Sequence, residues 1–221
     1  YDNLAPDLFF EVDHGPYVVD NNIALSACSI QENTDGGAYL HNLFAGDVVR
    51  YDDPRYTPYH LNHSTEVKGF RTITEGDHRF YNNLFVGGDD AKKKYGLSAF
   101  NASQWPVVAA DNLFLGSAKP MSGKGQGWVM ETEDPNLRIE ETPDGVYLIS
   151  DIDCAELAAF KGKPVDARRL GVAKLSGYPF EHPDGTPFVL DKDYWGKTRS
   201  GQAPTVGPVE TLPHGNRIRV W

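Results

Sequence analysis

Hydrophobic and polar positions alternate over short stretches in the first 116 residues, and four of these stretches are alike. Each places an asparagine before a leucine or an isoleucine, and three of them continue Leu-Phe-x-Gly. The stretches are VVDNNIAL from Val18, YLHNLFAG from Tyr39, FYNNLFVG from Phe80 and AADNLFLG from Ala109. Short alternating runs punctuated by Gly and Asp are typical of short strands joined by tight turns. The pattern predicts strands and almost no helix up to about residue 116.

The asparagines of the four stretches recur at spacings that suit the coils of a solenoid. They are Asn22, Asn42, Asn83 and Asn112, and successive spacings are 20, 41 and 29 residues. These spacings correspond to one coil, to two coils or one coil with a long excursion, and to one coil with an insertion. Because a single coil cannot bury its apolar face alone, we expect the Leu-Phe pairs to stack and the asparagines to form a hydrogen-bonded ladder. The predicted fold is all-β, a right-handed parallel β-helix over residues 1–116.

The pattern changes after residue 116. Two alternating runs, 136–140 and 145–149, are joined by the turn sequence Pro143-Asp144-Gly145, which predicts a hairpin. We therefore expect a strand-rich extension over residues 117–178 that packs on the coils. Residues 179–221 are rich in Pro, Gly and Asp and predict an irregular C-terminal tail.

Charge and hydropathy narrow the classes of partner. The chain of 221 residues has a net charge of −10, and its only basic run is Lys92-Lys93-Lys94. Nucleic acids and anionic membrane surfaces are bound by clustered cations that release counterions, and no apolar run approaches the ~20 residues that span a bilayer. We expect neither a nucleic-acid nor a membrane partner.

The cysteines and histidines offer little support for a metal or a cofactor. Cys28 and Cys154 lie far apart and suggest no disulfide framework, which slightly favours an intracellular location over secretion. His60 and His63 form an HxxH pair, but no predicted helix aligns them for zinc. We expect no metal and no cofactor. Because the chain opens at Tyr1 inside what resembles a repeat, we also expect it to be part of a longer protein.

Glu11 is the candidate for acid/base chemistry. It lies between Phe10 and Val12 in an alternating run, so its side chain projects from one face of a strand. A 20-residue coil would align it with Gln31. Acids at equivalent positions of strands about 4.8 Å apart would approach the ~5–5.5 Å separation of a retaining glycosidase pair. Since Gln31 is not an acid, a partner for Glu11 would lie upstream of this chain; the alternative is that Glu11 is a solvated strand residue.

Several histidines accompany Glu11 in the first part of the chain. Neutral sugars are held by hydrogen bonds to their hydroxyl groups and by stacking on aromatic faces. We expect His14, His41 and His60 to contact such a substrate.

Two stretches of this sequence resemble a known family. DLFFEVDHGPYVVDNN from Asp7 and GGAYLHNLF from Gly36 are similar to the glycoside hydrolases of family 120, which are right-handed β-helix enzymes with β-xylosidase activity. Segments of the tail, at 184–187 and 193–197, are also similar. The resemblance implies a retaining enzyme that cleaves terminal xylose, or a similar pentose, from oligosaccharides, with Glu11 as general acid/base.

The same resemblance implies that this chain is incomplete on its own. The aspartate nucleophile of the family would lie about two dozen residues before Glu11, and the family's β-sandwich would lie nearer the N-terminus. The expected partners are therefore an oligosaccharide substrate and the N-terminal part of the same protein; a homo-oligomer is compatible with both.

Two other functions stay open. A polysaccharide lyase on the same fold needs an acidic calcium cluster, for which Asp52-Asp53 and Asp89-Asp90 are the acidic pairs available, but a net charge of −10 suits an anionic substrate poorly. A non-catalytic carbohydrate-binding β-helix would use the same groove without chemistry at Glu11.

Overall fold

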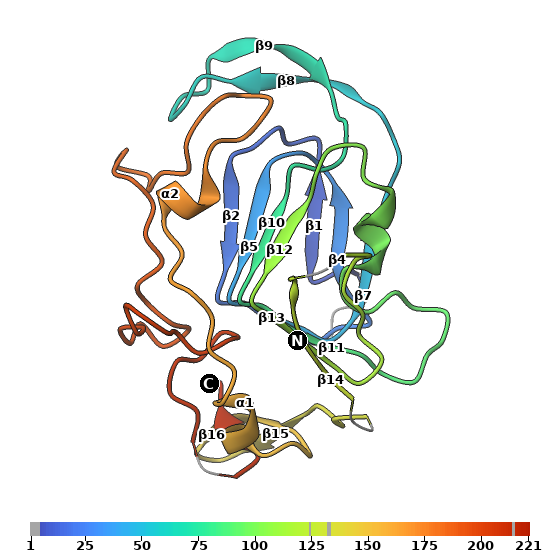
Figure 1. Cartoon of the computed structure of the whole chain (residues 1–221), viewed down its shortest axis with the longest axis vertical. Helices are drawn as coiled ribbons and strands as arrows, with labels where there is room; N and C mark the ends of the chain where they lie inside the picture. The colour runs from blue at the N-terminus through green and yellow to red at the C-terminus, as the bar shows by residue number, and fades with distance from the viewer. Residues whose placement is uncertain (1–4, 124, 132–133, 214) are drawn as a thin grey trace.

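Three parallel sheets form the centre of the molecule (Figure 1). The computed structural model describes residues 5–123, 125–131, 134–213 and 215–221. The first sheet contains β1 (Leu8–Glu11), β4 (Cys28–Asn33) and β7 (Asp47–Arg50). The second contains β2 (Tyr17–Asp20), β5 (Gly37–Leu40), β10 (Arg79–Tyr81) and β12 (Val108–Ala110). The third contains β3 (Ile23–Ala24), β6 (Leu43–Phe44), β11 (Leu84–Val86), β13 (Asn112–Leu115) and β14 (Gly127–Met130).

Two antiparallel sheets and three short helices complete the described structure. The antiparallel strands are β8 (Tyr56–His60) and β9 (Val67–Thr72), and β15 (Arg138–Thr142), β16 (Gly145–Ile149) and β17 (Arg217–Arg219). The helices are the 3₁₀ helix η1 (Ser98–Ala102), α1 (Cys154–Leu157) and α2 (Ala167–Leu170). The predicted hairpin of the extension is confirmed as β15 and β16, and β17 from the tail adds its third strand.

A right-handed parallel β-helix is wrong as the fold class of this chain. The molecule is all-β, but it combines parallel and antiparallel sheets. The β8–β9 hairpin lies within the 41-residue interval between Asn42 and Asn83. Its two strands are antiparallel, with Tyr56 opposite Thr72. This hairpin bonds to itself instead of adding strands to the parallel sheets, and the β15–β17 sheet is likewise antiparallel.

The predicted asparagine ladder is confirmed. Nδ2 of each asparagine donates to Oδ1 of the next at 3.0 Å, from Asn22 to Asn42, Asn83 and Asn112. The residue before each ladder asparagine has a positive φ, between 53° and 59°, and these residues are Asn21, His41, Asn82 and Asp111. Asn, Asp and His tolerate this left-handed conformation better than most residues. The chain therefore bends sharply between the second and third sheets, and the asparagine side chains satisfy the polar backbone at each bend.

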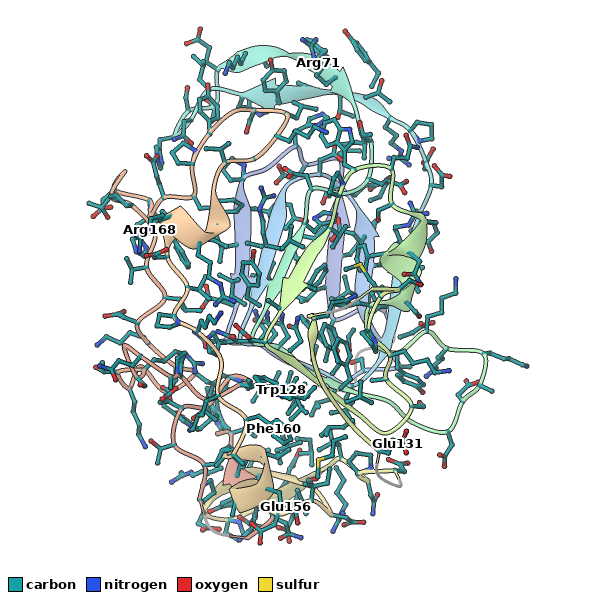
Figure 2. All side chains as sticks on the ribbon, viewed as in Figure 1. Arg71, Trp128, Glu131, Glu156, Phe160 and Arg168 are labelled. Atoms are coloured by element: carbon teal, nitrogen blue, oxygen red, sulfur yellow. The ribbon has the colours of Figure 1, made fainter. Side chains whose placement is uncertain are left out.

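The repeated Leu-Phe pairs divide their side chains between two cores. The phenylalanines Phe44, Phe85 and Phe114 stack inside the parallel sheets, with ring centroids 5.4 and 5.2 Å apart. The leucines face the other way and pack against the β15–β17 sheet and α1. Trp128 of β14 and Phe160 after α1 contact each other at this junction, with ring centroids 5.6 Å apart (Figure 2).

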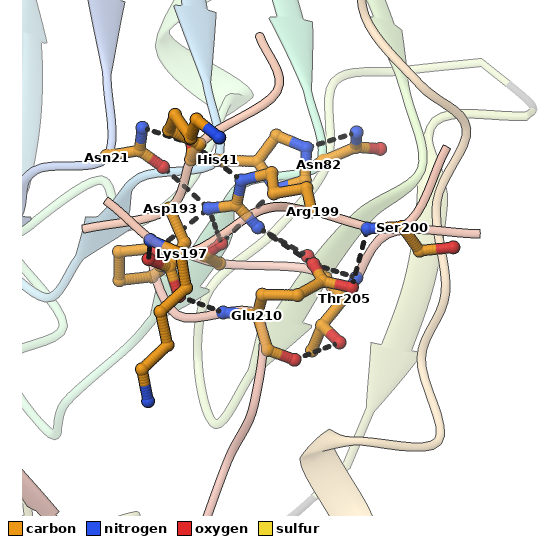
Figure 3. A network of polar contacts seen from close by, with 12 residues as sticks. Asn21, His41, Asn82, Asp193, Lys197, Arg199, Ser200, Thr205 and Glu210 are labelled. Atoms are coloured by element: carbon orange, nitrogen blue, oxygen red, sulfur yellow. Dashed lines mark hydrogen bonds and ion pairs between the residues drawn. The ribbon is translucent and has the colours of Figure 1, made fainter. Parts of the chain in front are cut away.

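The tail is fastened to the bends of the parallel sheets by a buried arginine. Arg199 donates to Asn21 Oδ1 at 2.6 Å and to the Pro208 carbonyl at 2.8 Å, and it pairs with Glu210 (Figure 3). His41 Nδ1 lies 3.2 Å from the Gly207 carbonyl in the same network. At the other end of the parallel strands the β8–β9 hairpin arches over the sheets (Figure 1).

Candidate active site

Glu11 is the last residue of β1, at the point where the chain turns toward β2. The turn uses a positive φ at Val12 (60°) and at Gly15 (62°). A β-carbon at Gly15 would lie 2.6 Å from the Gly36 carbonyl oxygen, so this close approach requires glycine. The predicted strand is confirmed, and its end holds Glu11 at the edge of the first sheet.

The predicted alignment of Glu11 with Gln31 is wrong. Glu11 pairs with Asn33 in the parallel register of β1 and β4, while Gln31 pairs with Phe9. The second sheet follows the expected 20-residue offset, with Val19 opposite Tyr39. The offset between β1 and β4 is two residues longer, while that between β4 and β7 is shorter, because the connections between strands differ in length.

An open cavity of about 350 Å³ lies beside Glu11. Its walls come from the β1–β2 turn, from the β8–β9 hairpin and from one tyrosine directly before the tail. The lining residues are Glu11, Val12, Asp13, His14, Gly15, Pro16, Pro58, Tyr59, His60, Leu61, Asn62, His63 and Tyr178. We call this the Glu11 cavity. Carboxylates, imidazoles, an amide and two phenol rings give it the hydrogen-bonding groups and aromatic faces that suit a neutral sugar.

The Glu11 carboxylate is paired with Arg55. Arg55 Nη1 lies 2.5 Å from Glu11 Oε1, and Arg55 Nε lies 3.0 Å from Asp53 Oδ2. The Glu11 side chain is 34% exposed and that of Arg55 47%. An ion pair this open to solvent contributes only about 0–1 kcal/mol to stability. Its effect is to orient the carboxylate at the mouth of the cavity, where a ligand can still reach it.

His14 is buried in the wall of the Glu11 cavity. Its Nε2 lies 2.9 Å from Thr57 Oγ1 and its Nδ1 lies 3.6 Å from Asp35 Oδ2. Its ring meets that of Tyr59 edge-on at 6.0 Å. His14 therefore connects the β1–β2 turn to the hairpin that roofs the cavity.

The other two predicted histidines lie in different places. His60 is exposed at the end of β8 and lines the Glu11 cavity. His41 is buried under the tail and accepts a hydrogen bond from Asn82 Nδ2 at 2.7 Å. Burial, reinforced by the charge of Arg199, holds the pKa of His41 well below its usual value. The structure thus brings Glu11, His14 and His60 together and keeps His41 apart from their cavity.

The sequence alone did not predict two residues of this site. Arg55 pairs with Glu11, and Tyr178 lines the cavity wall. Neither residue belongs to a repeated motif, and no local pattern in the sequence indicates that it lies near Glu11. Among the described residues, no group of three or more His, Cys, Asp or Glu side chains is arranged to hold a metal ion. The helices in the described part of the chain are all too short or too polar to cross a membrane.

A buried polar cluster around one acid, Glu32, inside the parallel sheets was also missed. Glu32 of β4 is 1% exposed and accepts hydrogen bonds from the hydroxyls of Tyr17, Thr34 and Tyr39. Burial raises the pKa of Glu32 to about 8, against the lowering effect of the Thr34 and Tyr17 hydrogen bonds. Burial also lowers the pKa of His78, whose Nε2 lies 4.0 Å from Glu32, to about 3. Both groups are therefore uncharged at neutral pH.

Comparisons with known proteins give one informative similarity. No protein-family model and no curated protein matches the chain. A solved structure of XylC in complex with xylose is similar, with 33% sequence identity and a TM-score of 0.86. The similarity covers 96% of this chain and 37% of the XylC chain. This chain therefore spans little more than a third of the length of a protein that binds xylose.

Proposed function

We propose that this chain carries the general acid/base of a retaining glycoside hydrolase that removes terminal xylose, or a similar pentose, from oligosaccharides. The observation that carries the proposal is the position of Glu11, at the mouth of an open polar cavity, in a chain similar to xylose-binding XylC. The resemblance of the segment around Glu11 to family 120 β-xylosidases supports the same function.

In the first step of this mechanism the Glu11 carboxyl group donates its proton to the glycosidic oxygen. A second carboxylate attacks the anomeric carbon as the bond to the leaving group breaks, forming a covalent glycosyl-enzyme. In the second step the Glu11 carboxylate removes a proton from water, whose oxygen attacks the anomeric carbon and releases both sugar and nucleophile. We propose that the nucleophile is an aspartate on the N-terminal part of the same protein.

The surroundings of Glu11 suit these two steps. Arg55 holds the carboxylate in place when it is ionised, and the exposed third of the side chain leaves room for a leaving group or a water molecule. Tyr59 and Tyr178 offer aromatic faces, and His60 and Asn62 offer hydrogen bonds to sugar hydroxyls.

The test is Glu11→Gln in the intact protein, assayed on an aryl β-xyloside. Loss of the proton donor and acceptor should lower kcat by about 10²–10⁴-fold, the usual contribution of general acid–base catalysis. Binding of xylobiose, measured by calorimetry, should change little because the amide keeps the size of the side chain.

The matched control is Glu66→Gln, an exposed glutamate of the neighbouring hairpin turn, which should retain full activity. Undiminished hydrolysis in Glu11→Gln would refute the proposed role. If sugar binding persisted in that case, a non-catalytic carbohydrate-binding module would be the better description.

A further inference from the structure

A second hollow adjoins the Glu11 cavity. It has a volume of about 560 Å³ and lies between β2, the hairpin and the tail. Its lining residues are Pro16, Tyr17, Val18, Asp20, Asn62, His63, Pro179, Phe180, Glu181, His182, Pro183 and Phe188. Pro16, Asn62 and His63 line both hollows, so the two spaces meet at these residues.

A carboxylate of the second hollow contacts the two hairpin residues at which the hollows meet. Glu181 Oε2 accepts a hydrogen bond from Asn62 Nδ2 at 2.6 Å, and His63 Nε2 lies 2.8 Å from the same oxygen. Since Asn62 and His63 line both spaces, this single oxygen ties the end of the hairpin to the tail where the hollows meet. We call these contacts the Glu181 bridge.

The chain on either side of Glu181 is held by other contacts. Phe180 and Phe188 are buried in a core cluster with Leu40, and Glu181 forms a backbone bridge with Pro187. Before Glu181, Lys68 Nζ donates to the Ser176 carbonyl at 3.1 Å. Removal of the Glu181 carboxylate should therefore open the bridge without releasing the tail.

The second hollow has the chemistry of a sugar subsite. The half-buried His182 packs on the buried Phe188, with ring centroids 5.1 Å apart, and gives the hollow an aromatic wall. Asp20 and Asn62 provide an acceptor and an amide for hydroxyl groups. Neutral sugars need this combination of a flat apolar surface with a few polar groups at its margin.

We propose that the Glu181 bridge determines the length of saccharide that the site accepts. With the bridge closed, a ligand occupies the Glu11 cavity alone; with the bridge open, the two hollows form one groove for a longer chain. Glu181 is then a specificity-determining residue, and its role rests on the proposed glycosidase function of the Glu11 cavity.

The test is calorimetric titration of the intact protein with xylobiose and with xylotetraose. All variants carry Glu11→Gln, so that the sugars are not hydrolysed during the titration. Glu181→Ala should bind xylotetraose about tenfold more tightly than the parent, while its affinity for xylobiose stays within about twofold. Glu66→Ala removes an exposed carboxylate from the same hairpin turn and should leave both affinities unchanged.

A second, more conservative variant keeps the test decisive if Glu181→Ala does not fold. Glu181→Gln keeps an acceptor oxygen and the size of the side chain, and it should give a smaller shift in the same direction. Unchanged affinities, or equal changes for the two sugars, in the folded variants would overturn the role of the bridge.

The outcomes also separate this inference from the function on which it rests. A selective gain for xylotetraose together with full hydrolytic activity of Glu11→Gln would overturn the catalytic proposal and leave the bridge in place. Failure of every variant to bind either sugar would overturn both.

Discussion

Glu32 shows how a single buried residue can set the pH dependence of stability. Its pKa is about 8 in the folded protein and about 4.5 in an unfolded chain, so between these values the folded state holds a proton that the unfolded state has lost. The stability associated with this proton is complete below pH 4.5 and is lost as pH rises through 8. His78 has the opposite effect on stability, because its pKa of about 3 in the folded protein lies below the usual 6.5. Its contribution makes stability increase with pH between these two values and is constant above pH 6.5.

The pH range from 6.5 to 8 therefore isolates Glu32, and Glu32→Gln tests it there. The free energy of unfolding of the unmodified protein should fall by up to about 1.4 kcal/mol per pH unit across this range. Glu32→Gln should show a much flatter profile, since an amide does not titrate. Urea denaturation at several pH values measures both slopes. Equal slopes in the two proteins would show that Glu32 does not carry the effect, and Glu66→Gln serves as the exposed control.

At the scale of elements, the asparagine ladder joins successive strands where the chain bends. Asn83 is fully buried; its Nδ2 donates to Asn112 Oδ1 at 3.0 Å and to the Tyr39 carbonyl at 2.8 Å. Its own Oδ1 accepts from the backbone amide and from Nδ2 of Asn42. Every polar atom of this side chain is thus used between two layers of strands.

Asn83→Ala should consequently lower the free energy of unfolding far more than Asn22→Ala, which changes the end of the ladder. The first change leaves several buried donors and acceptors unpaired, each at a cost of about 1–3 kcal/mol, so we expect a loss of about 3 kcal/mol or more. Asn22 is only half-buried, so Asn22→Ala should lower the free energy of unfolding by about 1 kcal/mol. Guanidinium denaturation gives both values, and similar losses at the two positions would argue against a cooperative ladder.

At the scale of the whole molecule, the tail is held to the parallel sheets by buried polar contacts of Arg199. This arginine is 5% exposed and pairs with Glu210 while donating to backbone carbonyls of the tail and to Asn21. The tail also lines the second hollow through Glu181, and Tyr178, the residue directly before the tail, lines the Glu11 cavity. The shape of the proposed binding site therefore depends on how firmly the tail is docked.

Arg199→Met keeps an unbranched side chain but removes the charge and the donors. Loss of one partner from a buried ion pair costs about 3–5 kcal/mol, so the tail should become protease-sensitive and lose amide-exchange protection over residues 190–210. Limited proteolysis followed by mass spectrometry detects this change. The control is Arg168→Met, at an exposed position of α2 (Figure 2); equal protection in both variants would contradict the role of Arg199.

The sequence by itself determined features that depend on neighbouring residues or on a pattern repeated in phase. The strand at Glu11, the asparagine ladder, the stacked phenylalanines and the hairpin at Pro143-Asp144-Gly145 follow from alternation, side-chain hydrogen bonding and turn chemistry, and all are present. These properties act over a few residues, or between repeats that must stack because each alone leaves its apolar face exposed.

Only the tertiary structure decided the fold class and the composition of the site. The β8–β9 hairpin folds back over the sheets, and β1 pairs with β4 at an offset two residues longer than expected. The tail covers His41, and Tyr178, the residue before the tail, lines the Glu11 cavity. The hairpin and the register depend on the lengths of the connections between strands. The tail contacts depend on residues more than a hundred positions apart, such as His41 and Gly207. Glu32 is the plainest case, because an acid in an alternating strand is expected to face solvent, and only the packing of Tyr17 and Tyr39 around it made burial as a neutral group stable.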